Sequence, residues 1–187
     1  SFWGNDTLYF YSTRFGGSVC RVTRNGDIWT QPSKVSLTIP AGKSLGKQFS
    51  ITTDGIIYAE LWNNDDSDAD IYRWKLVDGR YSAYEKPNEN INSPEYDFMP
   101  FIEPNERYLL FCRQSPEGFG KTDIYISFRN ADGTWTKAIN MGSKINTPEE
   151  EGFPSISPDG KYFFFCREGK FGFNPYWVSA KIIEELR

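Results

Sequence analysis

Histidine is absent from this chain of 187 residues. Its absence excludes the Ser-His-Asp and Cys-His nucleophilic systems and most zinc sites, because these depend on an imidazole. Carboxylate chemistry remains, either with paired acids as in glycosidases or with a tyrosine nucleophile beside arginines as in sialidases. The composition therefore excludes histidine-dependent catalysis and leaves acid-dependent carbohydrate chemistry open.

The chain is also poor in cysteine and has no long hydrophobic run. Cys20, Cys112 and Cys166 are an odd number, which does not suit a disulfide framework, so we expect small buried side chains there. No apolar stretch approaches about 18 residues, so no membrane span is predicted. A net charge of −4 without a long basic run argues against a nucleic-acid partner.

What the chain does contain is a repeat of about 50 residues. Residues 92–100 (NSPEYDFMP) correspond to residues 146–154 (NTPEEEGFP), and residues 108–113 (YLLFCR) correspond to residues 162–167 (YFFFCR). A tight turn is expected in each of four copies, at Asn5-Asp6, Asp54-Gly55, Pro104-Asn105 and Pro158-Asp159-Gly160. Such a period, with several short strands in each copy, is typical of a β-propeller, in which each copy is one blade.

Each copy also predicts a third and a fourth strand. The third strand is expected over residues 70–74 and 123–127, where apolar and polar residues alternate. Two-residue hairpin signals then follow at Asn25-Gly26, Asp78-Gly79 and Asp132-Gly133. The sequence therefore predicts an all-β propeller of four-stranded antiparallel blades. We expect one domain over residues 1–187, with blades at approximately 1–45, 46–96, 97–150 and 151–187, the last without its outer strand.

Four blades fall short of the six or more that are common for such repeats. We therefore expect the chain to be the C-terminal part of a longer propeller. An open array of blades leaves two apolar sheet faces uncovered, so we also expect it to self-associate.

Arginine recurs at the end of the second strand, as Arg14, Arg113 and Arg167, whereas the second copy has Asn63 there. Three guanidinium groups at one rim could clamp a carboxylate. The alternative, which we favour, is that each arginine serves its own repeat by covering a neighbouring aromatic ring with its stem.

A binding face is expected on the loops that enter each inner strand and on those that join the second and third strands. These loops carry aromatic side chains and carboxylates, and such surfaces are typical of protein or sugar contacts. The alternative is that each ring folds back over its own blade. The candidate ligand-binding residues are Arg14, Trp62, Asn63, Glu95, Asp97, Arg113, Phe119, Glu150, Arg167 and Phe171.

The most acidic stretch covers residues 63–70. Its acids Asp66, Asp68 and Asp70 alternate as oxygen ligands do in calcium loops. However, Ile71 stands where the calcium-binding EF-hand loop needs glycine, and no bidentate glutamate follows. We therefore favour a solvated loop and predict no metal and no other cofactor.

Residues 157–165 (SPDGKYFFF), the two Asp-Ile-Tyr strands and the ending at residues 176–186 resemble the WD40-like, or PD40, propeller repeats. These repeats are similar to those of the periplasmic protein TolB. The resemblance implies a six-bladed propeller and a periplasmic or extracellular location, and it brings no shared catalytic residues. We expect a non-enzymatic binding or scaffold module that presents its loop face to a protein or cell-envelope partner. The alternative is a carbohydrate-binding or sialidase- or glycosidase-like propeller that uses the rim carboxylates Glu95, Asp97 and Glu150.

Overall fold

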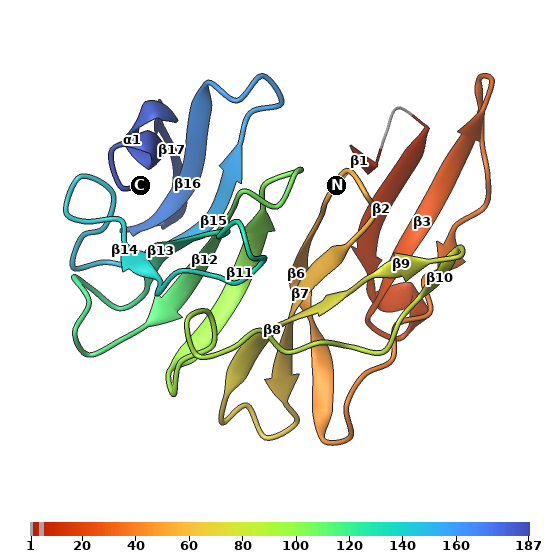
Figure 1. Cartoon of the computed structure of the whole chain (residues 1–187), viewed down its shortest axis with the longest axis horizontal. Helices are drawn as coiled ribbons and strands as arrows, with labels where there is room; N and C mark the ends of the chain where they lie inside the picture. Colours follow the sequence, from red (N-terminus) through yellow and green to blue (C-terminus); the bar gives the residue numbers. More distant parts are fainter. Residues whose placement is uncertain (1, 4–5) are drawn as a thin grey trace.

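The computed structural model describes residues 2–3 and 6–187, and it is an all-β structure. Four antiparallel sheets follow one another in chain order along an arc (Figure 1). In the described part of the chain, the helical segments are η1 (Thr13–Phe15) and α1 (Lys181–Glu184). None of these described helices is long and apolar enough to cross a membrane. Of the four expected inner turns, the first includes Asn5, which lies outside the described residues.

The sheets differ in the number of their strands. Sheet 1 contains β1 (Phe2–Trp3), β2 (Thr7–Ser12), β3 (Ser18–Asn25), β4 (Ile28–Trp29) and β5 (Ser33–Lys34). Sheet 2 contains β6 (Lys43–Ile51), β7 (Ile57–Asn63) and β8 (Ala69–Trp74), and it is followed by a separate hairpin of β9 (Leu76–Val77) and β10 (Arg80–Tyr81). Sheet 3 contains β11 (Tyr96–Ile102), β12 (Tyr108–Gln114), β13 (Asp123–Phe128) and β14 (Ile139–Asn140). Sheet 4 contains β15 (Glu151–Ile156), β16 (Tyr162–Gly169) and β17 (Gly172–Ser179).

The hairpin between β9 and β10 forms where the sequence predicts one. Asp78 and Gly79 both have positive φ, 49° and 74°, as a two-residue hairpin turn demands. The strands β9 and β10 pair with each other and do not join sheet 2. After the hairpin, a single bridge between Arg73 and Glu85 links the chain to β8. The outer strand of this copy is therefore replaced by a loose connection.

The hydrophobic core consists of three layers, each between two neighbouring sheets. The layer between sheets 1 and 2 includes Tyr9, Val19, Ile57, Leu61 and Trp74. The layer between sheets 2 and 3 includes Tyr58, Ile71, Leu109, Phe111 and Trp135. The layer between sheets 3 and 4 includes Leu110, Cys112, Ile126, Phe163 and Phe165. Sheets 2 and 3 lie between two other sheets, so both of their faces are buried. This explains why their strands are almost continuously apolar.

The first strands of sheets 2, 3 and 4 each contain a β-bulge. Register shifts occur between Leu45 and Phe49 in β6, between Phe98 and Phe101 in β11, and between Gly152 and Ser155 in β15. A bulge aims backbone groups away from the ladder and bends the strand. The bulges of β11 and β15 contain Met99 and Phe153, which both have positive φ.

Candidate functional site

Arg113 of β12 is held by a buried carboxylate. Its Nε donates to Asp97 Oδ1 at 2.7 Å, and its Nη2 donates to the Ile91 carbonyl at 2.8 Å. The guanidinium lies 4.8 Å from the ring centroid of Tyr125. The second oxygen of Asp97 accepts hydrogen bonds from the backbone N–H and the hydroxyl of Ser93, at 2.7 and 2.8 Å. Both partners are therefore fully engaged inside the protein.

Arg167 of β16 repeats the same set of contacts. Its Nε donates to Glu151 Oε1 at 2.6 Å, its Nη2 donates to the Ile145 carbonyl at 2.8 Å, and its guanidinium lies 4.8 Å from the Tyr176 ring. Thr147 takes the place of serine and donates to both oxygens of Glu151. An arrangement that recurs with the repeat, with every polar group paired, fits the structural interpretation of these arginines rather than a carboxylate clamp.

Sheets 1 and 2 do not repeat this motif. Arg14 lies on the short helical segment η1, after the end of β2, and it is exposed. Asn63 ends β7, and its amide donates to Ser67 Oγ at 3.0 Å across the following loop. The repeat is therefore broken at the end of β7.

Four further candidate residues lie on the loops of sheets 3 and 4. Phe119 and Phe171 project into solvent, with 48% and 95% of their surface exposed, so Phe171 does not fold back over its own sheet. Glu95 and Glu150 are half-buried. Burial and the charge of Glu168 raise the pKa of Glu150 above its ordinary value.

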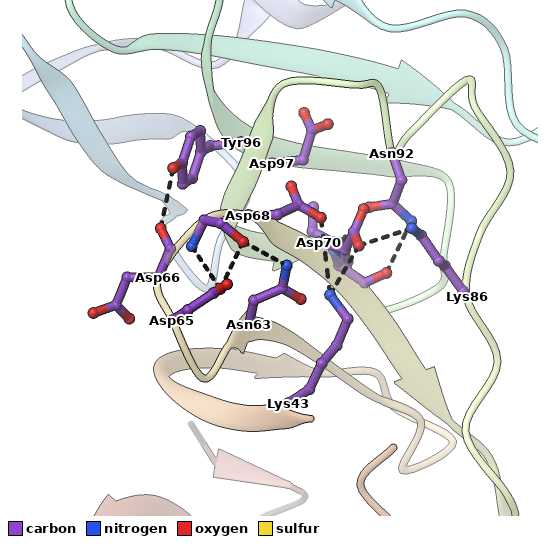
Figure 2. Close-up of polar contacts among 12 residues, drawn as sticks. Lys43, Asn63, Asp65, Asp66, Asp68, Asp70, Lys86, Asn92, Tyr96 and Asp97 are labelled. Carbon is purple, nitrogen blue, oxygen red and sulfur yellow. Dashed lines mark hydrogen bonds and ion pairs between the residues drawn. The ribbon is translucent and has the colours of Figure 1, made fainter. Parts of the chain in front are cut away.

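The loop between β7 and β8, residues 64–68, is the second place where the repeat is broken (Figure 2). Asp65 accepts hydrogen bonds from the hydroxyl and the backbone N–H of Ser67, at 2.6 and 3.1 Å, and these bonds lower its pKa. The Asp66 carbonyl accepts a hydrogen bond from the Tyr96 hydroxyl at 3.0 Å. Asp65 and Asp66 are exposed, and Asp68 is half-buried. The loop is thus ordered by its own polar groups, and it presents carboxylates to solvent.

Asp70, the first acid after this loop, is 1% exposed and faces two lysines. Its Oδ2 accepts from Lys86 at 2.7 Å and from Lys43 at 3.2 Å. Its Oδ1 is buried and has no hydrogen-bond partner among the described residues. Burial and the nearby charge of Asp70 raise the pKa of Asp68, which lies 3.9 Å from Lys43.

The equivalent residue of sheet 3 has a complete set of partners. Asp123 accepts from the backbone N–H of Phe119 at 2.6 Å, from that of Gly120 at 3.2 Å, and from the Asn140 amide at 2.8 Å. The loop before Asp70 is shorter and brings no such N–H groups, and Lys86 stands where the repeat has Asn140. An unpartnered buried oxygen therefore accompanies the acidic loop of sheet 2 and not the equivalent loop of sheet 3.

The structure does not gather the carboxylates of Asp66, Asp68 and Asp70 around one point. Within residues 2–3 and 6–187, no group of three or more acidic or cysteine side chains is placed to hold a metal ion. Figure 2 shows the Asp66 carboxylate pointing away from the other two, while Asp70 points into its lysine pair. Asp66 lies in a turn with a φ of 57°, whereas Asp70 lies in strand β8.

Aromatic side chains flank the acidic loop. The Trp62 ring lies 5.9 Å from Tyr96 and 5.7 Å from Phe98, and both Trp62 and Tyr96 remain partly exposed. We refer to Asp65, Asp66 and Asp68, with Trp62 and Tyr96, as the acidic patch. The sequence singled out Trp62, Asp66 and Asp68 but missed Tyr96, which only the folded structure brings beside this loop.

A cavity of about 440 Å³ lies between sheets 1 and 2, next to the acidic loop. Lys43 lines this cavity as well as contacting Asp70. Other lining residues are Tyr11, Ser18, Val19, Lys34, Val35 and Leu45. The cavity therefore combines hydroxyl groups and cations with an apolar floor, which is the composition of a small-molecule pocket.

Solved structures with a similar fold are β-propeller enzymes. The α-L-arabinanase of Penicillium chrysogenum is 16% identical over 96% of this chain and 64% of its own, with a TM-score of 0.52. The α-L-arabinofuranosidase Arb93A of Fusarium graminearum is 14% identical over 88% of this chain and 55% of its own, with a TM-score of 0.53. A prolyl endopeptidase is 14% identical over 96% and 27%, also with a TM-score of 0.53.

The chain spans less than two thirds of each of these proteins, and at such identities the likeness shows the fold alone. No family model matches the sequence, and no curated protein gives a significant match. The predicted all-β propeller fold is confirmed by the antiparallel sheets and by these structures.

Proposed function

We propose that this chain is a non-enzymatic binding module of the β-propeller type, whose acidic patch contacts a protein partner that carries basic side chains. The observation that carries the proposal is the break in the repeat. Sheets 3 and 4 pair Arg113 and Arg167 with buried acids, whereas sheet 2 has Asn63 at that position and an acidic loop behind it. Functional surfaces tend to lie where a repeat departs from its own symmetry.

The electrostatics of the loop favour a cationic ligand. The hydrogen bonds from Ser67 lower the pKa of Asp65, so they favour its ionised form. Asp66 adds a second exposed carboxylate. Trp62 and Tyr96 offer amphipathic ring edges of the kind that anchor protein contacts.

The contacts of the repeated acids favour binding over catalysis. Both carboxylate oxygens of Asp97 accept hydrogen bonds, from Arg113 and Ser93. Both oxygens of Glu151 likewise accept hydrogen bonds, from Arg167 and Thr147. A glycosidase needs two carboxyl groups that face a common substrate with room for water or a nucleophile between them. Acids that hold a strand end in place cannot also meet that requirement.

The proposal also includes a partner in the cell envelope and a periplasmic or extracellular location. The resemblance of residues 157–165 to the WD40-like, TolB-type repeats supports a partner in the cell envelope. It equally supports a periplasmic or extracellular location for the module.

Immobilised peptides of equal length and aromatic content, rich in arginine, serine or glutamate, test this proposal. The chain is expected to bind the arginine-rich peptide, and the triple variant Asp65→Asn/Asp66→Asn/Asp68→Asn is expected to lose most of that binding. The matched control Asp27→Asn/Asp54→Asn/Glu184→Gln removes the same charge from exposed acids elsewhere. Equal losses in the two triple variants would show that only net charge matters and would refute a specific patch.

The cavity beside Lys43 favours a second candidate function, the binding of a carbohydrate. Its volume of about 440 Å³ is sufficient for a small sugar, and Tyr11, Ser18 and Lys34 supply polar contacts. A thermal-shift screen with neutral, uronic-acid and sialic-acid oligosaccharides tests this candidate, because a ligand in excess raises Tm. A shift that Tyr11→Phe reduces would support it, and no shift with any sugar class would exclude it in favour of the protein partner.

A further inference from the structure

We infer that a second pocket, between the outer strand of sheet 1 and the β9–β10 hairpin, binds a small anion that carries a phosphate group. This inference goes beyond the proposed function and does not depend on it. It rests on the charge of the pocket, on the contacts of the equivalent arginine in the next sheet, and on the chemistry of the lining residues.

The pocket has a volume of about 420 Å³ and is lined by three cationic side chains. These are Arg21 from β3, Lys34 from β5 and Arg80 from β10. No acidic residue is among the described residues that line it, and Asp78 in the turn of the hairpin stays outside it. We refer to this site as the cationic pocket. Its lining therefore carries three positive charges and no negative charge.

Arg73 of β8 stands in sheet 2 where Arg21 stands in sheet 1. Arg21 pairs with Tyr9 across the ladder, and Arg73 pairs with Tyr58 in the same way. Tyr9 belongs to the layer between sheets 1 and 2, and Tyr58 belongs to the layer between sheets 2 and 3. Because residues opposite each other on paired strands share a face, each arginine turns toward the next sheet.

The arginine of sheet 2 receives its counter-charges from the chain itself. Arg73 Nη2 lies 2.7 Å from Glu85 Oε2, and Arg73 Nη1 lies 3.5 Å from Glu106 Oε1. Glu85 also forms the bridge opposite Arg73. Opposite Arg21, the chain has Ser33 instead. The acid that pairs with the arginine of sheet 2 is therefore replaced by a neutral residue in sheet 1.

The cations of the pocket are not neutralised from elsewhere in the described chain. Within residues 2–3 and 6–187, none of Arg21, Lys34 and Arg80 forms an ion pair with a carboxylate. Burial raises the pKa of Tyr81, which also lines the pocket, and the charge of Arg21 opposes this rise, so the two side chains lie close together. A cleft lined by charges of one sign raises the local concentration of ions of the opposite sign.

The lining favours a multiply charged anion with a small organic body. Arginine forms paired hydrogen bonds with phosphate as well as with carboxylate, and Lys34 adds a point charge. A phosphate monoester carries about two negative charges at neutral pH, so it matches three cations better than a single carboxylate does. Ser36 and Thr38 supply hydroxyl groups, and the buried Val35 supplies an apolar surface. The volume is sufficient for a phosphate group with a body of monosaccharide size.

Isothermal titration calorimetry of the whole chain with glucose 6-phosphate, galacturonic acid and glucose tests this inference. At neutral pH these sugars carry about two, one and no negative charges. We expect glucose 6-phosphate to bind most tightly and glucose not to bind. Absence of binding by glucose 6-phosphate would overturn the inference. Galacturonic acid that binds as tightly as glucose 6-phosphate would also overturn it, because the site would then not select a phosphate group.

The double variant Arg21→Gln/Arg80→Gln assigns the binding to this pocket. Lys34 also lines the cavity of about 440 Å³, whereas the two arginines line only the cationic pocket. The affinity of this variant for glucose 6-phosphate is expected to fall about tenfold or more, because hydrogen bonds between charged groups are lost. The matched control Arg14→Gln/Lys137→Gln removes the same charge from exposed side chains outside the pocket. Equal losses in both double variants would mean that only net charge attracts the ligand, and would overturn the inference.

Inorganic phosphate is the fourth probe, because it has the charged group without the organic body. Tighter binding of glucose 6-phosphate would assign the pocket to organic phosphates, and equal affinity would assign it to the free anion. Either result supports a phosphate site. Melting curves without ligand verify that each variant is folded, as expected for substitutions of exposed side chains. The single variant Arg80→Gln, which leaves sheet 1 unchanged, is expected to show part of the same loss of affinity.

Discussion

Arg113→Met is the most informative perturbation of the fold, because the contacts of Arg113 are the ones that recur with the repeat. The methionine keeps much of the apolar stem that lies beside Phe111 and Tyr125, but it removes the charge that neutralises Asp97. The Asp97 side chain is fully buried, so its carboxylate would be left inside the protein without a counter-charge.

The expected loss of stability in Arg113→Met follows from the burial of Asp97. Removing one partner of a buried ion pair costs about 3–5 kcal/mol, because the remaining charge is uncompensated. The two hydrogen bonds from Ser93 still support Asp97, which places the expected loss near the lower end, at about 3 kcal/mol. Domains of this kind are stable by about 5–15 kcal/mol, so the variant should fold but unfold at clearly lower denaturant.

Urea unfolding at two pH values measures this loss. Burial raises the pKa of Asp97, and Arg113 opposes the shift, so removing the arginine raises the pKa further. A carboxyl group with a raised pKa in the folded state stabilises it at low pH and loses that contribution as the pH rises through the folded pKa. The penalty of Arg113→Met should therefore be smaller at about pH 5 than at about pH 8.

The double variant Asp97→Asn/Arg113→Met is the control, since it removes both charges together. Its loss of stability should be smaller than the sum of the two single losses, because contacting residues are coupled. A loss below about 1 kcal/mol for Arg113→Met, the value of a surface ion pair, would refute the reasoning. A loss that is equal at both pH values would also refute it.

Two further predictions concern the joints between the sheets. Asn146→Ala should cost about 1–3 kcal/mol in chemical denaturation, because its amide pairs with both the N–H and the carbonyl of Ile124, and the exposed Asn130→Ala should cost far less. Burial raises the pKa of Glu60, which accepts the N–H of Met99 at 2.8 Å. The free energy of unfolding should therefore fall as the pH rises from the ordinary value of 4.5 through the folded pKa, and Glu60→Gln should flatten this slope. A slope that is unchanged in the variant would assign it to other groups.

The sequence predicts those parts of the fold that depend on local signals. The repeat and its turns are sufficient to predict the succession of antiparallel sheets. Asp78-Gly79 is sufficient to predict its hairpin, because few pairs of residues adopt positive φ at two neighbouring positions. The equivalent positions of Arg113 and Arg167 in their strands could be predicted, because the two arginines stand one repeat apart. Their acid partners could not be assigned, because several acids of each copy lie close enough in sequence.

The features that the sequence does not reveal all depend on contacts between residues that lie far apart in the sequence. The side chains of Asn92 and Asn146 form hydrogen bonds with the backbone of Ile71 and Ile124 in the preceding sheet. Nothing in the sequence around either asparagine predicts these bonds. The bulges of β11 and β15 place Met99 and Phe153, which are not glycines, at positive φ. The approach of Lys86 to Asp70 likewise requires the folded loop.

The repeat itself provides the means of separating structural from functional residues in this chain. A residue whose contacts recur in the next copy, as those of Arg113 recur at Arg167, is explained by the need of every copy to hold its strands. A residue whose contacts do not recur needs another explanation. Asp70, with two lysines and an unpartnered oxygen where Asp123 has a full set of donors, is such a residue. An unpaired buried oxygen costs stability, so the need of each copy to hold its strands does not explain this one.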